Sequence, residues 1–336
     1  MEKKSFKETV GIDISKDVLD VTLHLAKLHH QFSNHLKGFR ELLKWIKAHS
    51  GYPLEQVLIC FEHTGMYSLP LATFLSKNKI AYVMESSLQI KRSLGIARGK
   101  NDKIDSRRIA QYAYMRRDSL KIYQLPSASL QKLQELLSLR ERLVKQRNGF
   151  KSALKSQKQM LTRKNNPLIF SVQEKMIEQL SIQIKAIEKE MKSIIEADPE
   201  LKSIYKLVIS VKGIGFIIGT HLLVNTQCFT KFENARQYAC YCGVAPFEHS
   251  SGTSIRGKTK VSHYANKKIK SLFDLAARTA IQNDPELKYY YESRVEKGKS
   301  KMSVLNAVRN KLVHRVFAVV KRGTPFVPLF RPNVAA

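Results

Sequence analysis

The sequence predicts an α/β domain at the N-terminus, followed by a long α-helical hairpin and a mainly α-helical C-terminal domain. Short apolar runs alternate with amphipathic segments up to Leu125, as in a sheet covered by helices. Residues 129–197 are polar and carry apolar side chains near heptad spacing. Beyond Asp198 the predicted helices are shorter and are separated by glycine and proline. We therefore place three domains at 1–125, 126–198 and 199–336.

The first domain is predicted to open with three strands, because apolar and polar side chains alternate after an apolar first run. Strands and helices then alternate. The expected elements are strands at 10–14, 18–25 and 28–35, a helix at 37–49, a strand at 57–61, a helix at 66–77, a strand at 81–85, a helix from 87 and a helix at 103–115. This is the element order of the ribonuclease H-like fold. That fold places carboxylates in the middle of the first strand, at the end of the fourth and on a later helix.

Four acidic residues fall at those places: Asp13, Glu62, Asp102 and Asp105. Asp102 and Asp105 are three residues apart, so both can point from one helical face. Four carboxylates held together repel one another, so the cluster predicts bound Mg²⁺ or Mn²⁺, and two such ions can clamp a phosphodiester. Taken singly, each acid has an ordinary explanation as a turn or helix cap. Nearby cations suit a nucleic-acid phosphate; they are Arg98, Lys100, Lys103, Arg107 and Arg108.

Residues 129–197 predict two long amphipathic helices that form an antiparallel hairpin or a coiled-coil arm. Pro167 marks the turn, and we expect the second helix to start at Gln173. The hairpin is either a spacer or an oligomerisation arm. Its narrow apolar stripes need a partner surface, which favours oligomerisation.

The last domain is expected to hold short helices at 232–242, 272–281 and 304–320. Before them, residues 208–215 resemble a helix-hairpin-helix, in which the turn at Gly213 and Gly215 lets backbone N–H groups approach a phosphate. A plain turn between helices explains the same residues equally well.

Residues 248–260 are predicted to be a polar, flexible loop that contains serines and three cations. A serine flanked by glycine and cations suits a nucleophile that attacks a phosphodiester, with the cations neutralising the developing charge. The alternative is a phosphate-binding loop without covalent chemistry, and the residues alone favour it. The cations of this segment and of the helix that follows are Arg256, Lys258, Lys260, Lys267 and Lys268.

Net charge is the dominant bulk property of the 336-residue chain. Lys and Arg total 58 against 28 Asp and Glu, and 23 of the basic but only 7 of the acidic residues follow position 200. Such an excess points to a polyanionic partner, DNA or RNA. No apolar run is long enough to span a membrane, and the first residues lack a signal-peptide core. Four unevenly spaced cysteines favour a reducing cytoplasm, and Cys240, Cys242 and His249 do not have common zinc spacing.

The whole chain resembles one family through a combination of short motifs. These are Gly11-Ile12-Asp13, Glu62-x-Thr64-Gly65, Lys100-Asn101-Asp102-x-x-Asp105, the lysine-rich hairpin, Gly213-Ile214-Gly215, Gly243-Val244-Ala245-Pro246 and Ser250-Ser251-Gly252. The combination is similar to that of the Piv/MooV-type DEDD transposases and site-specific DNA invertases, the insertion-sequence 110 family. One departure is minor, because Asn101 stands where a small or hydroxyl residue is commoner.

The resemblance implies a RuvC-like metal domain, a coiled-coil domain and a C-terminal transposase domain with a catalytic serine. The family's serine precedes the glycine, which assigns this role to Ser251, and the adjacent Ser250 stays open. The resemblance also implies a homo-oligomer, a dimer or tetramer, in which the serine of one protomer completes the metal site of another. In relatives a structured bridge RNA pairs with target and donor DNA, so double-stranded DNA and a guide RNA are the expected partners.

We therefore expect a magnesium-dependent transposase or site-specific recombinase of a mobile element. A RuvC-like Holliday-junction nuclease would need the acids but no serine, and a non-catalytic nucleic-acid-binding module would need the charge alone. The sequence leaves insertion and inversion undecided. The residues expected to contact nucleic acid are Arg98, Lys100, Lys103, Gly213, Gly215, Arg256, Lys258, Lys260, Lys267 and Lys268.

Overall fold

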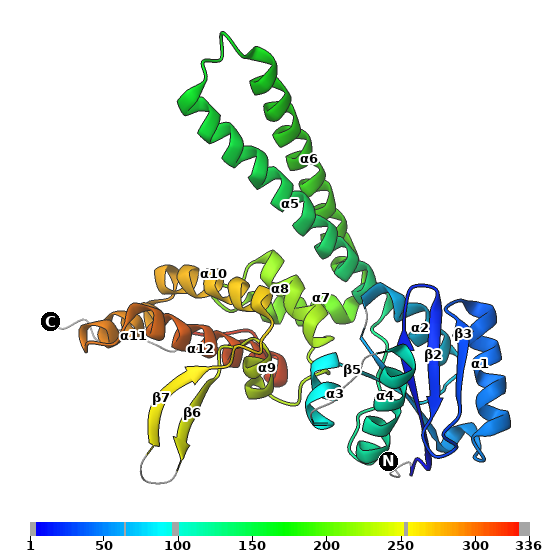
Figure 1. Ribbon diagram of the computed structural model, residues 1–336. Coiled ribbons are helices and arrows are strands. Elements are labelled where there is room, and N and C mark those ends of the chain that lie inside the picture. Colours follow the sequence, from blue (N-terminus) through cyan, green and yellow to red (C-terminus); the bar gives the residue numbers. More distant parts are fainter. Residues whose placement is uncertain (1–4, 64, 96–100, 252–254, 329–336) are drawn as a thin grey trace. The chain divides into compact units, whose positions relative to one another are not determined.

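The structure is a computed structural model that describes residues 5–63, 65–95, 101–251 and 255–328. The side chains of residues 249–251, 255, 256, 258 and 259 are outside this description. The chain forms two compact units, 1–125 and 126–336 (Figure 1). Within the described part of the chain, none of the helices combines the length and apolar composition needed to cross a lipid bilayer.

The first unit is built on a five-stranded sheet in the order β3-β2-β1-β4-β5. Strands β1 and β2 pair antiparallel, as do β2 and β3, whereas β4 is parallel to both β1 and β5. The first strand along the chain is therefore the central one. The strands are β1 (Glu8–Ile14), β2 (Val18–Leu23), β3 (His29–Ser33), β4 (Val57–Glu62) and β5 (Tyr82–Glu85).

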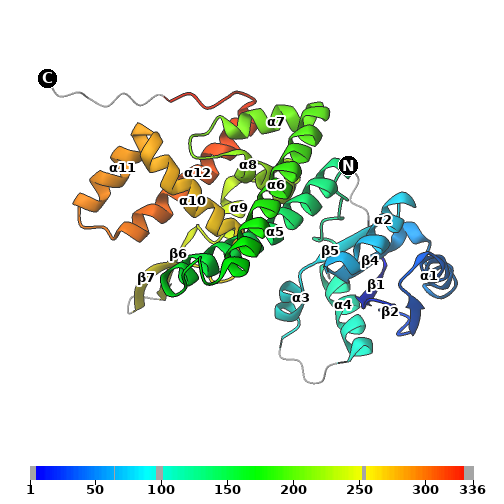
Figure 2. The ribbon, with the colours of Figure 1, turned by 90° about the horizontal axis from the view of Figure 1, so that it is seen from above.

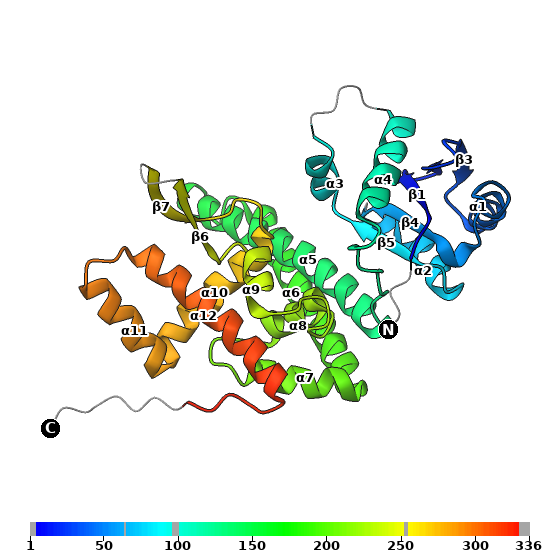
Figure 3. The same cartoon turned by 90° about the horizontal axis from the view of Figure 1, so that it is seen from below.

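Helices cover both faces of this sheet, and the alternation of side chains along the strands decides which face each residue joins. On one face, Ile12 and Ile59 pack into a core with helices α1 (Leu36–His49) and α2 (Leu69–Lys77). On the other, Leu58 and Cys60 pack with α3 (Ser87–Ser93) and α4 (Asp102–Arg116). Figures 2 and 3 show α2 and α4 on opposite sides of the sheet.

Helix α4 lies unusually close to β1 because Gly11 has no side chain. A Cβ atom on Gly11 would lie 2.1 Å from the backbone nitrogen of Ala110 and 2.2 Å from the carbonyl oxygen of Ser106. Two hydrogen bonds fix the helix in this position: Thr9 Oγ1 donates to the Ala110 carbonyl at 2.9 Å, and the Thr22 and Ser106 hydroxyls pair at 2.8 Å. At this point, hydrogen bonds between the sheet and the helix take the place of the layer of apolar side chains that usually separates them.

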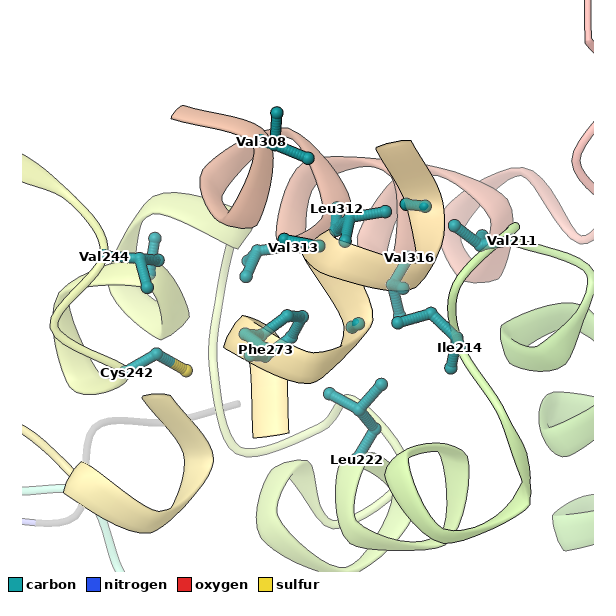
Figure 4. Close-up of a cluster of buried hydrophobic side chains, with 14 of the residues drawn as sticks. Val211, Ile214, Leu222, Cys242, Val244, Phe273, Val308, Leu312, Val313 and Val316 are labelled. Carbon is teal, nitrogen blue, oxygen red and sulfur yellow. The ribbon is translucent and has the colours of Figure 1, made fainter. Parts of the chain in front are cut away.

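The second unit is mainly helical. Its first two helices, α5 (Ala128–Met160) and α6 (Pro167–Ala197), form a long hairpin. The others surround a core in which Val308, Leu312 and Val316 of α12 lie near Phe273 of α10 (Figure 4). The remaining elements are α7 (Pro199–Ile209), α8 (Phe216–Thr226), α9 (Ala235–Tyr241), β6 (Pro246–Ser251), β7 (Ile255–Val261), α10 (Lys267–Asn283), α11 (Pro285–Glu296) and α12 (Lys301–Arg322).

The structure confirms a mixed α/β N-terminal region and a helical C-terminal region, an arrangement consistent with a ribonuclease H-like fold. A coiled-coil function for α5 and α6 stays a prediction. The four cysteines are free thiols, and Cys60 and Cys242 are buried.

Two local predictions were wrong. Residues 248–251 and 255–260 are not the expected loop, because they belong to the strands β6 and β7, which pair antiparallel. A strand pattern is present in residues 255–261, because every second residue is a cation and the residues between them are Ile255, Gly257, Thr259 and Val261. The polar residues of this segment concealed the pattern. Helix α6 begins at Pro167 and not at the expected Gln173. Pro167 therefore follows the turn at residues 163–165, and as the first helical residue its missing N–H costs no helical hydrogen bond.

Replacing Gly11 by alanine should destabilise the first unit by about 3 kcal/mol or more, because the added methyl group overlaps the backbone of α4 and forces helix and sheet apart. Urea unfolding followed by circular dichroism measures the change. Gly149→Ala is the matched control, since Gly149 lies in α5 with nothing near its Cβ position and alanine is the better helix former. Equal stability of the Gly11→Ala variant and the unchanged protein would contradict the close contact.

Candidate metal-dependent active site

Asp13 lies near the carboxyl end of the central strand, two residues beyond Gly11. Because side chains alternate along a strand, Asp13 and Gly11 face the same side of the sheet, the side covered by α4. Thr9 contacts Ala110 and Gly11 lies against Ser106, so α4 runs antiparallel to β1. The first turn of α4 therefore lies at the level of Asp13.

Glu62 is the last residue of β4, the parallel neighbour of β1. The register pairs Ile12 with Phe61, so Asp13 and Glu62 follow at neighbouring positions on the same edge of the sheet. The hydroxyl of Ser87, the first residue of α3, donates a hydrogen bond to the Glu62 carboxylate. This contact orients Glu62 at the end of the strand.

Asp102 and Asp105 stand in the first turn of α4, where the helix dipole favours negative charge. Asn101 is the N-cap, since its Oδ1 accepts a hydrogen bond from the Ile104 backbone N–H at 2.7 Å. The alternative that Asp102 is the N-cap is therefore wrong. Asp105 accepts a hydrogen bond from Arg108 at 3.1 Å.

The four acids interact electrostatically. The pKa of Asp13 is raised from 3.8 to about 6, chiefly by burial and then by the negative charges of Glu62, Asp102 and Asp105, with a smaller effect of Asp20. A carboxylate that is partly withdrawn from water beside other carboxylates favours its neutral form unless a cation compensates. In the described residues no three acidic, histidine or cysteine side chains are already grouped closely enough to hold one ion.

A second polar group beside Asp13 was missed by the sequence reasoning. Asp20 is buried and pairs directly with Asp13 across the antiparallel β1–β2 ladder. Its Oδ1 contacts His29 Nε2 at 3.0 Å and accepts a hydrogen bond from Gln31 Nε2 at 2.9 Å. The signal was present in the sequence, because residues 20, 29 and 31 share one face once the registers are known.

Glu85 is another missed neighbour on this face. It pairs in register with Glu62 across the parallel β4–β5 ladder, and Tyr112 of α4 donates a hydrogen bond to its carboxylate at 3.1 Å. Among the predicted cations of this region, Lys103 is exposed on α4, whereas Arg98 and Lys100 lie outside the described residues.

In the second unit, Ser251 is the last residue of β6, and the register pairs it with Ile255 and pairs Ser250 with Arg256. The side chains of Ser250, Ser251, Arg256 and Lys258 lie outside the described residues. Lys260 is exposed on β7. The structure therefore places Ser251 and these cations on one hairpin by backbone register alone.

The α7–α8 turn and the start of α10 hold the other predicted residues of this unit. Gly213 has φ +93° and packs so closely on α10 that a Cβ would lie 2.6 Å from the Ala276 carbonyl oxygen, so packing alone requires this glycine. Gly215 is the N-cap of α8 with open space beside it, and both glycines line a surface pocket with Lys212. Lys267 and Lys268 begin α10, and Lys268 forms an ion pair with Glu141 of α5.

Comparison with known proteins gives matches over both units. Residues 10–163 match the IS110-type DEDD family described as "Transposase", and residues 205–292 match "Transposase IS116/IS110/IS902 family". The chain belongs to the IS110-type DEDD transposases and invertases. The first matched range of this transposase contains the four acids, and the second contains Ser251 together with the glycines and cations of the second unit.

Two relatives of this transposase are named for the inversion of a pilin gene, and a third belongs to an insertion element. It is 29% identical over 330 residues to the "Pilin gene-inverting protein" of Moraxella bovis, covering 95% of this chain and 98% of that protein. The protein of the same name from Moraxella lacunata is also 29% identical over the same span. A 43.6 kDa protein of the insertion element IS110 from Streptomyces coelicolor is 30% identical over 142 residues, covering 42% of this chain and 34% of that protein.

Replacing Asp13 by asparagine should raise the thermal stability of the metal-free transposase at pH 8, by about 2–4 °C. The folded pKa of about 6 exceeds the ordinary 3.8, so the stability from this carboxyl group is fully present below about pH 4 and is lost as the pH rises through 6. An amide does not ionise and escapes that loss.

Thermal unfolding in a chelator between pH 4 and pH 8 measures this effect. The difference between variant and unchanged protein should grow across this range, while Asp118→Asn, at an exposed aspartate on the same unit, should show no such trend. A difference that is independent of pH would contradict the assignment.

Proposed function

We propose that this transposase cuts and rejoins DNA strands at a divalent-metal site formed by Asp13, Glu62, Asp102 and Asp105. The raised pKa of Asp13 carries the proposal, since burial and three neighbouring negative charges act on one carboxyl group. Such a group is costly without a cation and fits one well, because hard oxygen ligands suit Mg²⁺ or Mn²⁺. When bound, the metal would act as a Lewis acid on the phosphodiester.

The chain's own side chains would position that site. Asp13 and Glu62 come from adjacent parallel strands and Asp102 and Asp105 from one helical turn, so rigid elements hold each carboxylate. The Ser87 hydroxyl orients Glu62, and Arg108 orients Asp105. Asp20, held by His29 and Gln31, lies next to Asp13 on the neighbouring strand and adds to the negative potential.

Ser251 would be the nucleophile. Its Oγ forms a bond to phosphorus while the bond from phosphorus to the adjoining nucleotide oxygen breaks, and that oxygen takes up the proton that the hydroxyl loses. The phosphoserine link conserves the energy of the phosphodiester for rejoining. Arg256, Lys258 and Lys260 are on the same hairpin as Ser251, and their charges would neutralise the phosphate during the transfer. Ser250 is the alternative nucleophile.

The proposed partners are double-stranded DNA, a structured guide RNA and further copies of this chain. The net charge of +30 suits polyanionic partners such as DNA and RNA. An oligomer would let the serine hairpin of one copy meet the acidic site of another.

Site-specific inversion is a second candidate outcome of the same chemistry. It is favoured by the relatives named for pilin gene inversion, which match this chain over 95% of its length. Insertion and inversion differ in the arrangement of the DNA sites and not in the strand-transfer step. Sequencing the junctions that the protein produces from a two-site plasmid separates them.

Replacing Ser251 by alanine should lower recombination at least about 1,000-fold, because the variant lacks the attacking oxygen. Quantitative PCR of the recombined junction, with the element and its flanks on one plasmid, measures the change. Ser250→Ala is the matched control and should stay within about 10-fold of the unchanged protein. Denaturing gel electrophoresis should also show a protein–DNA adduct that the Ser251→Ala variant lacks. Full activity of that variant would remove Ser251 from the chemistry.

Removing divalent cations should abolish strand cleavage, and adding Mg²⁺ or Mn²⁺ should restore it. Calorimetry should show Mg²⁺ binding weakened by about 10-fold or more in Asp102→Asn, because one ligand loses its charge. Asp118→Asn again serves as the control that keeps metal binding. Cleavage of equal rate in excess chelator would contradict a metal site, whatever the role of Ser251.

A further inference from the structure

The helical hairpin carries its charges in two different ways along its length. Near the base of the hairpin the cations of α5 are paired: Lys132 contacts Glu190 at 2.5 Å and Arg140 contacts Glu188 at 2.7 Å. Glu141 also pairs with Lys268 of α10. These ion pairs join α5 to its neighbours, so the first part of α5 has little charge left for a partner.

Farther along the hairpin, basic residues are no longer balanced by acidic residues nearby in the sequence. Residues 142–173 contain eight basic residues and no acidic one. Arg147 donates to the Ser181 hydroxyl at 3.4 Å, and Arg163 pairs with Glu174 at 2.9 Å. The six others are exposed, and the structure records no ion pair for them among the described residues; they are Arg142, Lys145, Lys151, Lys155, Lys158 and Lys164.

Three of these lysines form a stripe on one side of α5. Lys151, Lys155 and Lys158 are four and three residues apart, so they lie on one helical face over about 10 Å of helix. Duplex DNA carries about one negative charge per 1.7 Å of its axis, so a helix lying along the backbone meets phosphates over this whole length. The stripe is therefore opposite in charge to a phosphate backbone and long enough to contact several phosphates.

This part of α5 is not required for the core of the unit. The buried residues of α5 are Leu130, Leu133 and Leu137, all in its first ten residues. Figure 1 shows the far halves of α5 and α6 extending away from helices α7 to α12. A helix held at its base with an unpaired basic stripe farther out is built to reach a partner.

We infer that the stripe of Lys151, Lys155 and Lys158 binds the backbone of duplex DNA outside the cleavage site. The inference rests on the proposed function in taking DNA as the substrate. It adds a phosphate-contacting surface on the hairpin that positions DNA without reading its sequence.

The test is the triple variant Lys151→Gln, Lys155→Gln, Lys158→Gln of the full chain, measured by fluorescence anisotropy with a duplex of about 30 base pairs. A chelator is present, so the result does not depend on metal or on Ser251. The affinity should fall about 10- to 100-fold near 0.1 M salt, and the slope of log affinity against log salt should fall by about 2–3. A triple Lys→Arg variant keeps the charge and should bind as the unchanged protein does.

Lys175→Gln, Lys185→Gln, Lys189→Gln is the matched control. It removes the same charge from exposed lysines of α6 that are interspersed with Glu174, Glu178 and Glu188, and it should leave the slope unchanged. Unchanged affinity and slope in the α5 variant would overturn the inference. The inference would also be overturned if the α5 variant lost affinity only for a hairpin RNA of equal length. A change of oligomeric state with unchanged DNA affinity would overturn it as well. If the α5 variant loses DNA affinity as expected but the Ser251→Ala and metal-removal experiments contradict their predictions, only the proposed chemistry is rejected.

Discussion

The contact between Gly11 and the backbone of α4 is the constraint on which the first unit depends. Helices normally pack on sheets through side chains, and here that layer is missing at one point. The missing side chain lets the first turn of α4 come down to the level of the central strand. Thr9 and Thr22 then bond to the helix and keep it from sliding. The position of Asp102 and Asp105 relative to Asp13 follows from this packing.

The same packing places negative charges close together in a protein that is otherwise strongly positive. Burial and the neighbouring acids both oppose ionisation of Asp13, so the folded state gives up some stability to hold these groups. This is the usual relation between stability and function at a candidate active site. The contacts of Asp20 with His29 and Gln31 show how the sheet supports one more carboxylate there, because each partner comes from the next strand.

In the second unit, ion pairs form where helices meet, and most cations of the far part of the hairpin lie outside these pairs. Arg315 binds Asp284 and Glu286, and Arg309 binds Asp274, so helices α10, α11 and α12 are joined by partly buried ion pairs. In the far part of the hairpin Arg163 pairs with Glu174, whereas the other exposed cations have no ion pair within the described part of the chain; they are Arg142, Lys145, Lys151, Lys155, Lys158 and Lys164. The basic excess of this transposase is therefore concentrated at surfaces and is not spread evenly over the fold.

The sequence by itself determined the order of strands and helices in the first unit, the four acids and the basic character of the chain, because periodicity and charge are local properties. It also carried the family motifs that identify this protein as an IS110-type transposase. The strand pattern of 255–261 was hidden by polar residues, and the part played by Asp20 required the strand registers. Only the tertiary structure decided that Gly11 brings α4 onto β1, since this depends on a contact between two segments that lie far apart in the sequence.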